Sequence, residues 1–206
     1  PAPYASISGG SNRFGEIAGG VTSGDERWDV AVHAQHTTTR GFSDTNARVP
    51  FGSHNPDRDA FRQTMGNVNL GYKISQDWRV NARLLESEGM ARLDDGPGAD
   101  AYARLRNQVA SLELQGKVTA GWASSLRVGR STDEYNTLAT ASPFGSLGAY
   151  VTQQRQVTWN NNFATPLGAL VVLGEQLVQD VSKPDTQYDV SSRTINAAAV
   201  GLDGQA

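Results

Sequence analysis

The sequence predicts an all-β protein: an antiparallel transmembrane β-barrel segment of about ten strands, with short periplasmic turns and long extracellular loops. Three observations support this prediction. Apolar and polar residues alternate along the expected strands, short and long connections alternate along the chain, and aromatic residues gather beside the short connections. A membrane barrel gives only a weak apolar signal per strand, which agrees with a chain that is 38% hydrophobic.

The clearest element is a hairpin over residues 67–84. Even-numbered positions 68–74 and 78–84 are all apolar, and the odd-numbered positions beside them are polar or glycine. Residues 75–77, with the sequence Ser-Gln-Asp, are typical of a turn. Because successive side chains of a strand point to opposite faces, the hairpin has one apolar and one polar face. The apolar face must contact either a protein core or lipid.

The same alternation predicts strands along most of the chain, and no segment has a helical pattern. The expected strands cover residues 4–8, 14–23, 28–35, 67–74, 78–84, 110–118, 122–128, 157–163, 170–178 and 193–202. Longer polar segments are expected at about residues 40–59, 86–106, 131–150 and 182–192. The chain has no run of 18 apolar residues, so no transmembrane helix is predicted.

The predicted connections alternate between short and long. The short connections lie near Gly24, Gln76, Ala120 and Pro166, and the long ones lie near Ser53, Gly96, Ser142 and Pro184. Consecutive antiparallel strands place alternate connections at opposite ends of a sheet, so all short turns should lie at one end. This sorting is typical of outer-membrane barrels, and a soluble sandwich has no reason to show it.

The two faces of the predicted sheet differ in chemistry. Aromatic residues are expected to form a membrane-interface girdle near the short turns: Trp28, Tyr72, Trp78, Trp122 and Phe163. The alternative explanation is the general preference of strands for aromatic residues. Charged residues are expected to face the lumen: Lys73, Arg79, Arg83, Glu113, Lys117 and Arg127.

Composition excludes several classes of function. The 18 basic and 21 acidic residues give a net charge of −3, which does not suggest a nucleic-acid partner. The absence of cysteine excludes disulfide scaffolds and cysteine-based zinc sites. The chain contains no G-x-S-x-G motif and no glycine-rich phosphate loop before a helix, and we do not expect an enzyme.

Four motifs in order along the chain suggest a family. They are GSN at residues 10–12, TRGF at 39–42, PDRDAF at 56–61 and QQRQVTWNNNF at 153–163. The sequence resembles the first half of the barrel of TonB-dependent outer-membrane receptors, and is most similar to the cobalamin-transporter type. The resemblance implies a 22-stranded barrel with an N-terminal plug. Residues 1–206 would then be a partial barrel domain, roughly strands two to eleven, without the plug or the final strands.

The resemblance also implies a function. The chain would be part of the wall of a receptor in the outer membrane of a Gram-negative bacterium, importing a scarce, bulky ligand such as cobalamin or another corrinoid. Its partners would be outer-membrane lipid, the plug domain of the same parent chain, TonB through that plug, and the small-molecule ligand. A siderophore receptor of the same architecture is the alternative within this class.

Calcium in the extracellular loops is a further implication of the resemblance. In the cobalamin-transporter type, aspartates of the early extracellular loops bind calcium and order the loops. Asp57 and Asp59 match this pattern best, and Asp44, Asp94 and Asp95 match it less well. Carboxylates of flexible loops suit this hard cation. The alternative is that these carboxylates are simply solvated, and no other cofactor is expected.

Two readings from other classes remain open. An outer-membrane barrel enzyme, such as a protease, could use His33 and Asp44 at the barrel mouth as a base pair. The simpler interpretation is that both are polar residues of the lumen and rim. A soluble β-sandwich would instead require protein to cover the apolar face of residues 68–84.

Overall fold

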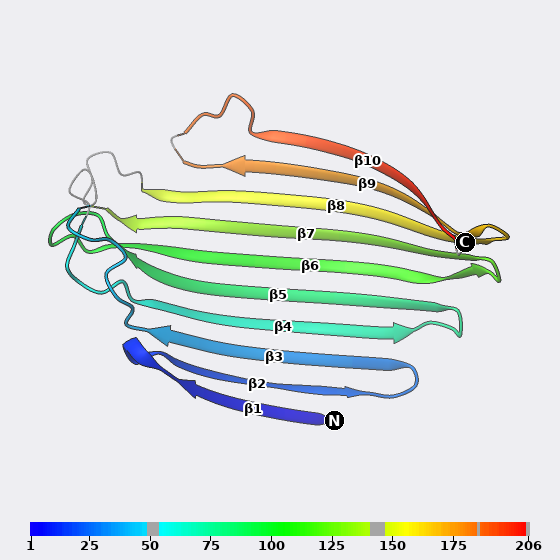
Figure 1. Ribbon diagram of the computed structural model, residues 1–206, viewed down its shortest axis with the longest axis horizontal. Coiled ribbons are helices and arrows are strands. Elements are labelled where there is room, and N and C mark those ends of the chain that lie inside the picture. Colours follow the sequence, from blue (N-terminus) through cyan, green and yellow to red (C-terminus); the bar gives the residue numbers. More distant parts are fainter. Residues whose placement is uncertain (49–53, 141–146, 185, 205–206) are drawn as a thin grey trace.

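The chain folds into one antiparallel β-sheet of ten strands, each paired with the next in sequence (Figure 1). The computed structural model describes residues 1–48, 54–140, 147–184 and 186–204, so the predicted loop centres Ser53 and Ser142 lie outside the described residues. The strands are β1 (Ala2–Gly9), β2 (Gly15–Gly24), β3 (Trp28–Thr39), β4 (Phe61–Lys73), β5 (Trp78–Leu93), β6 (Ala101–Thr119), β7 (Trp122–Ala139), β8 (Gly148–Thr165), β9 (Gly168–Ser182) and β10 (Ser192–Asp203). The prediction of an all-β, ten-stranded antiparallel fold is confirmed.

The sheet is open. Strands β1 and β10 form its two edges and lie on opposite sides of the molecule (Figure 1). Within the described residues, no strand pairs with the outer edge of either. A short 3-10 turn, η1 (Ser11–Arg13), joins β1 to β2. No helix in the described part of the chain has the length and apolarity needed to cross a membrane.

Connections of different length lie at opposite ends of the sheet (Figure 1). The short-turn end carries residues 25–27, 74–77, 120–121 and 166–167. The connections that follow β3, β5, β7 and β9 leave the sheet at the long-loop end, together with the connection at 10–14. The predicted sorting of short and long connections is therefore confirmed.

Two of the predicted loops are shorter in the structure than the sequence suggested. Strand β5 continues to Leu93 and β6 begins at Ala101, so most of the expected loop 86–106 is strand. Likewise, β7 reaches Ala139 and β8 begins at Gly148, which shortens the expected loop 131–150. The charged residues that suggested a loop pair across the β5–β6 ladder instead. Arg106 contacts Glu86 at 2.7 Å, and Arg104 contacts Glu88 at 3.5 Å. Opposite charges on neighbouring strands stabilise the pairing of the strands, so this part of the sheet does not need apolar residues.

Strand register gathers the apolar residues on one face. Ala82 lies opposite Leu112, Leu112 lies opposite Val128, and Val128 lies opposite Val157. Residues directly opposite each other share a face, so these four are neighbours on what we call the belt face. We call the other side of the sheet the opposite face.

No protein layer covers the belt face within the described residues. Nine of its large apolar side chains are between 38% and 55% exposed: Val32, Leu70, Leu84, Leu112, Leu114, Leu126, Val128, Val157 and Trp159. In the described residues, only Ala18, Ala101 and Ala103 are buried apolar side chains. The β-sandwich alternative requires a second layer over the belt face, and the described part of the chain forms a single sheet.

Candidate functional site

Three carboxylates meet at the long-loop end. Asp57 and Asp59 come from the connection between β3 and β4, and Asp94 comes from the connection between β5 and β6. One carboxylate oxygen of each lies within 4.8 Å of the others. The sequence named all three as calcium candidates, with Asp94 as a weaker match, and their meeting depends on how two separate loops fold together.

Side-chain hydrogen bonds hold these two loops together. The Asn55 side chain donates to the Ala99 carbonyl at 3.1 Å and accepts from the Gly98 N–H at 3.1 Å. Asn55 is only 5% exposed, and a buried amide with both ends satisfied fixes the two backbones relative to each other. From the first loop, the Thr45 N–H and the Ser43 hydroxyl donate to Asp94 Oδ2 at 3.0 and 3.3 Å.

Burial sets the electrostatics of the cluster. Asp59 is only 8% exposed, and burial raises its pKa, with the nearby carboxylates of Asp94, Asp44 and Asp57 acting in the same direction. The Asp44 N–H donates to Asp59 Oδ2 at 2.7 Å and opposes part of this rise. Burial also acts to raise the pKa of Asp94, but hydrogen bonds from Thr45 and Ser43 outweigh it and leave that pKa lowered.

Two oxygen atoms of the cluster have no hydrogen-bond partner among the described residues. They are Asp59 Oδ1 and Asp94 Oδ1, and both are buried. A buried carboxylate oxygen without a partner is costly, and nearby carboxylates repel one another when ionised. A cation held between the three residues would satisfy both needs. Calcium takes six to eight oxygen ligands from such loops, so the residues present fit the expected ion.

The two remaining aspartates take other roles in the structure. Asp44 supplies its backbone N–H to Asp59. Asp95 accepts a hydrogen bond from the Thr140 hydroxyl, which links the connection after β5 to the one after β7. Neither carboxylate belongs to the group of three.

The five aromatic residues expected in a girdle all lie on the belt face at the short-turn end. Trp28 lies opposite Tyr72, and Trp122 lies opposite Phe163 with ring centroids 5.6 Å apart. The Trp78 ring lies over Gly116, where an added Cβ would approach Trp78 Cδ2 to 2.6 Å. Their role at a membrane boundary stays a prediction.

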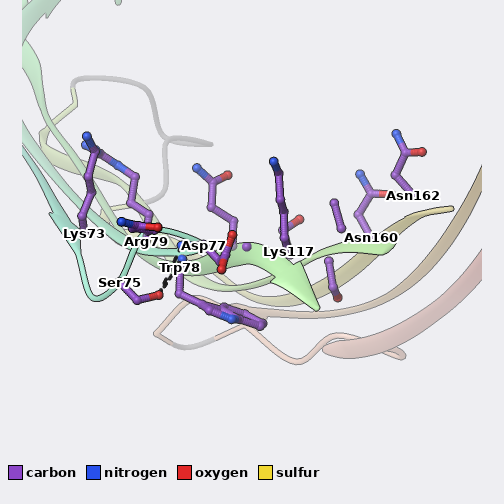
Figure 2. Close-up of a pocket in the computed structure, with 14 residues that line it drawn as sticks. Lys73, Ser75, Asp77, Trp78, Arg79, Lys117, Asn160 and Asn162 are labelled. Atoms are coloured by element: carbon purple, nitrogen blue, oxygen red, sulfur yellow. Dashed lines mark hydrogen bonds between the residues drawn. The ribbon is translucent and has the colours of Figure 1, made fainter. Parts of the chain in front are cut away.

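The residues expected to face the lumen all lie on the opposite face. Figure 2 shows Lys73, Arg79, Lys117 and Asn160 on one side of the sheet, with the Trp78 ring on the other. Lys73 and Arg79 are register partners, and Glu113 pairs with Arg127 at 2.8 Å. Within the described residues, Lys73, Arg83 and Lys117 make no ion pair.

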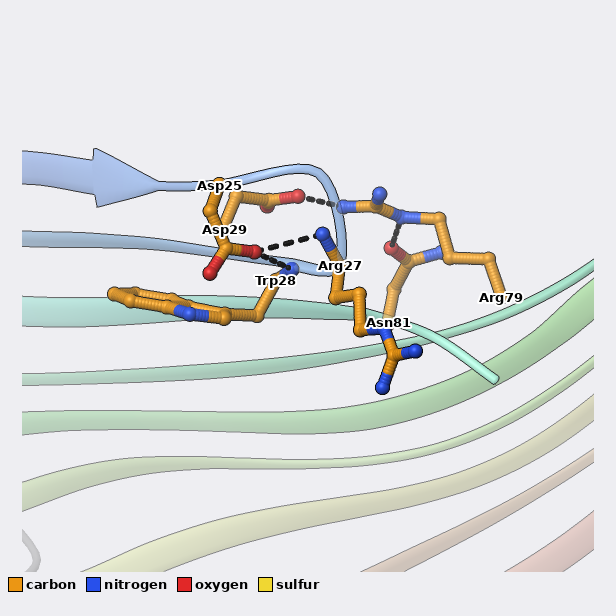
Figure 3. Close-up of polar contacts among 6 residues, drawn as sticks. All are labelled: Asp25, Arg27, Trp28, Asp29, Arg79 and Asn81. Atoms are coloured by element: carbon orange, nitrogen blue, oxygen red, sulfur yellow. Dashed lines mark hydrogen bonds and ion pairs between the residues drawn. The ribbon is translucent and has the colours of Figure 1, made fainter. Parts of the chain in front are cut away.

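An ion pair crosses strand β4 on this face. Arg79 of β5 reaches Asp29 of β3, and its Nε donates to Asn81 Oδ1 at 2.7 Å (Figure 3). Gly71 of β4 lies beneath, and a Cβ there would collide with the Arg79 guanidinium. The glycine between Asp29 and Asn81 thus makes the contact across three strands geometrically feasible.

The neighbouring turn is closed by Asp25. Its Oδ1 accepts the N–H groups of Arg27 at 2.7 Å and Trp28 at 3.0 Å (Figure 3). These backbone hydrogen bonds lower the pKa of Asp25, because they favour the charged form. The turn that introduces Trp28 is therefore fixed by a local carboxylate.

The two histidines of β3, His33 and His36, lie on opposite faces of the sheet. His33 hydrogen bonds with the Tyr4 hydroxyl and stacks on that ring, with centroids 5.9 Å apart. His36 lies on the belt face and contacts the Thr64 hydroxyl at 2.9 Å. In the part of the chain that the structure describes, no hydrogen bond joins His33 to Asp44.

Comparison of the sequence with models of known protein families gives no match. A search of curated proteins gives no match either.

Substituting Asp59→Asn tests the three-carboxylate site. The variant should lower calcium affinity at least about 10-fold, because it removes a charged ligand from the centre of the cluster. Calcium should slow amide hydrogen exchange over residues 54–60 in the wild type and have little effect in the variant. Asp77→Asn, at the other end of the sheet, is the control and should retain the wild-type response.

Asp59→Asn should also change how the free energy of unfolding of the metal-free protein depends on pH. The folded pKa of Asp59 lies above its ordinary value of 3.8, so its contribution to stability is full below that pH. The contribution is lost as the pH rises through the raised pKa, and Asp59→Asn should remove this loss.

The calcium experiment has its own contradicting outcome. If calcium still slowed amide hydrogen exchange over residues 54–60 in Asp59→Asn, the three-carboxylate site would be wrong.

Proposed function

We propose that this chain is part of the wall of a TonB-dependent outer-membrane receptor. The receptor imports a scarce, bulky ligand, a cobalamin or related corrinoid, across the outer membrane of a Gram-negative bacterium. The observation that supports this proposal most strongly is the uncovered apolar belt face of a single sheet. At the same positions along the strands, the opposite face carries polar side chains.

Lipid is the cover that the belt face best fits. Full burial of a large apolar side chain contributes roughly 1.5–3 kcal/mol, and side chains that stay about half exposed to water forgo part of that free energy. The exposed residues extend without interruption over neighbouring strands, and soluble monomers rarely expose a contiguous patch of this kind. The belt ends in the aromatic residues of the short-turn end, where rings with polar groups favour a lipid–water boundary.

Polar groups within the belt are satisfied by neighbours. The Trp122 indole N–H donates to Asn161 Oδ1 at 3.0 Å, and the Trp159 indole N–H donates to the Ser124 hydroxyl at 3.0 Å. Asn161 itself is only 3% exposed. Lipid offers no hydrogen bonds, so internal pairing is what a lipid-facing surface requires.

The belt occupies only part of each long strand. On β7 it extends from Trp122 to Val128, which is about 20 Å of strand and shorter than the ~25 Å apolar band of outer-membrane barrels. Beyond it, β5 and β6 carry the ion pairs of Glu86 and Glu88 on the same face. The long-loop end of the sheet therefore projects past the belt into a polar environment.

This orientation assigns a role to each end. The short turns lie at the periplasmic end and the long loops lie outside the cell, where the ligand arrives. The unpaired cations Lys73, Arg83 and Lys117 face the lumen, where the plug of the same parent chain lies and TonB acts on it. Bound calcium would neutralise Asp57, Asp59 and Asp94 and so hold the first two long loops together. No catalytic chemistry is proposed.

Substituting Leu126→Arg tests the lipid contact. Leu126 lies at the centre of the belt, so arginine there should destabilise the membrane-inserted protein by roughly 2–4 kcal/mol. The control Ser125→Arg places the same side chain on the opposite face and should have a much smaller effect. Urea unfolding of the intact receptor from phosphatidylcholine vesicles measures both. Equal effects of the two variants would contradict a lipid-facing belt.

The ligand is tested by binding to the detergent-solubilised intact receptor. Cobalamin should bind in preference to ferric chelates, and calcium should tighten the binding, because the loops that carry Asp59 and Asp94 also face the incoming ligand. Asp59→Asn should remove the calcium effect. Preferential binding of a ferric siderophore would overturn the corrinoid assignment and leave the transport class intact.

A further inference from the structure

Two arginines stand side by side where the belt ends. Arg130 of β7 and Arg155 of β8 are register partners and lie on the belt face. Each lies two residues beyond the partner valines Val128 and Val157, at the long-loop side of the belt. Two residues of strand correspond to about 6.6 Å, so the guanidinium groups begin where the apolar surface stops.

Only one arginine of this pair has a carboxylate partner within the described residues. Like charges directly opposite each other destabilise a sheet unless something neutralises them. Arg155 contacts Asp180 at 3.1 Å, whereas Arg130 donates to the neutral Gln153 side chain at 3.1 Å. Within the described residues, no carboxylate forms an ion pair with Arg130.

The neighbouring arginine on the same face shows the contrast. Arg106 of β6 contacts Glu86 at 2.7 Å, and the Gln108 amide binds the same carboxylate at 3.1 Å. That guanidinium is matched by a carboxylate of the adjacent strand. At the β7–β8 pair, the β9 carboxylate Asp180 forms an ion pair with Arg155 alone, and Arg130 has no carboxylate partner among the described residues.

We propose that Arg130 and Arg155 bind the phosphate group of an anionic lipid in the leaflet at the long-loop end. This inference rests on the proposed function, in which the belt face contacts lipid. Acyl chains lying against Val128 and Val157 would bring the headgroup to the level of the guanidiniums. Arginine binds phosphate through paired N–H donors, and its aliphatic stem can lie along apolar surface while the charge reaches the headgroup.

Spin-labelled lipids test this site in the intact receptor. In phosphatidylcholine vesicles, spin-labelled phosphatidic acid should associate with the wild type in preference to spin-labelled phosphatidylcholine. The double variant Arg130→Gln/Arg155→Gln should lose this preference, by roughly fivefold for each arginine. Asp180→Asn should strengthen it, because it removes the carboxylate that competes for Arg155.

The matched control is Arg127→Gln. Arg127 lies on the same strand but on the opposite face, where it pairs with Glu113 at 2.8 Å, so its loss should leave the lipid preference unchanged. An equal loss in Arg127→Gln, or an unchanged preference in the double variant, would overturn the site. Added inorganic phosphate should not abolish the lipid preference. If inorganic phosphate binds through Arg130 and Arg155 and no lipid preference is found, the ligand is free phosphate and not a lipid headgroup.

The outcomes separate this inference from the proposed function. If the wild type and the double variant insert equally into phosphatidylcholine vesicles and neither prefers phosphatidic acid, the phosphate site is wrong and the membrane wall stands. If the wild-type receptor does not insert into any vesicle, the proposed function is wrong, and the phosphate site is overturned with it.

Discussion

A single β-sheet satisfies its backbone hydrogen bonds by pairing strand with strand, but it cannot bury either of its faces. In this chain, the apolar residues are concentrated on one face and nothing in the described residues covers them. The other features of the sheet agree with that constraint. The indole N–H groups of Trp122 and Trp159 find partners within the sheet, and charged side chains lie on the opposite face or beyond the belt.

The two ends of the sheet differ in how they are held. At the short-turn end, Asp25 closes one turn through backbone N–H groups, and Gly71 makes room for Arg79 to reach Asp29. At the long-loop end, the loops depend on side-chain contacts such as those of Asn55, and Asp59 remains incompletely satisfied. The proposed calcium ion would thus act at the long-loop end, where Asp59 and Asp94 lie.

The period-two pattern was sufficient to predict the strands, their faces and the sorting of their connections, because alternation follows directly from strand geometry. It failed where the residues are charged. The charged segment 86–106 has the composition of a loop, and only the strand register shows that Glu86 and Arg106 contact each other across neighbouring strands. The meeting of Asp94 with Asp59 was also beyond the sequence, because it depends on tertiary contacts between two irregular loops.

A nitroxide scan along β6 of the intact protein in phosphatidylcholine bilayers tests the central claim most directly. Labels at Ala110, Leu112 and Leu114 lie on the belt face, and labels at Ser111, Glu113 and Gln115 lie on the other. If the belt face contacts lipid, collision with oxygen will peak at the three even positions, and a water-soluble nickel chelate will be excluded from them. Even positions shielded from both reagents would show that protein covers the belt and would contradict the account.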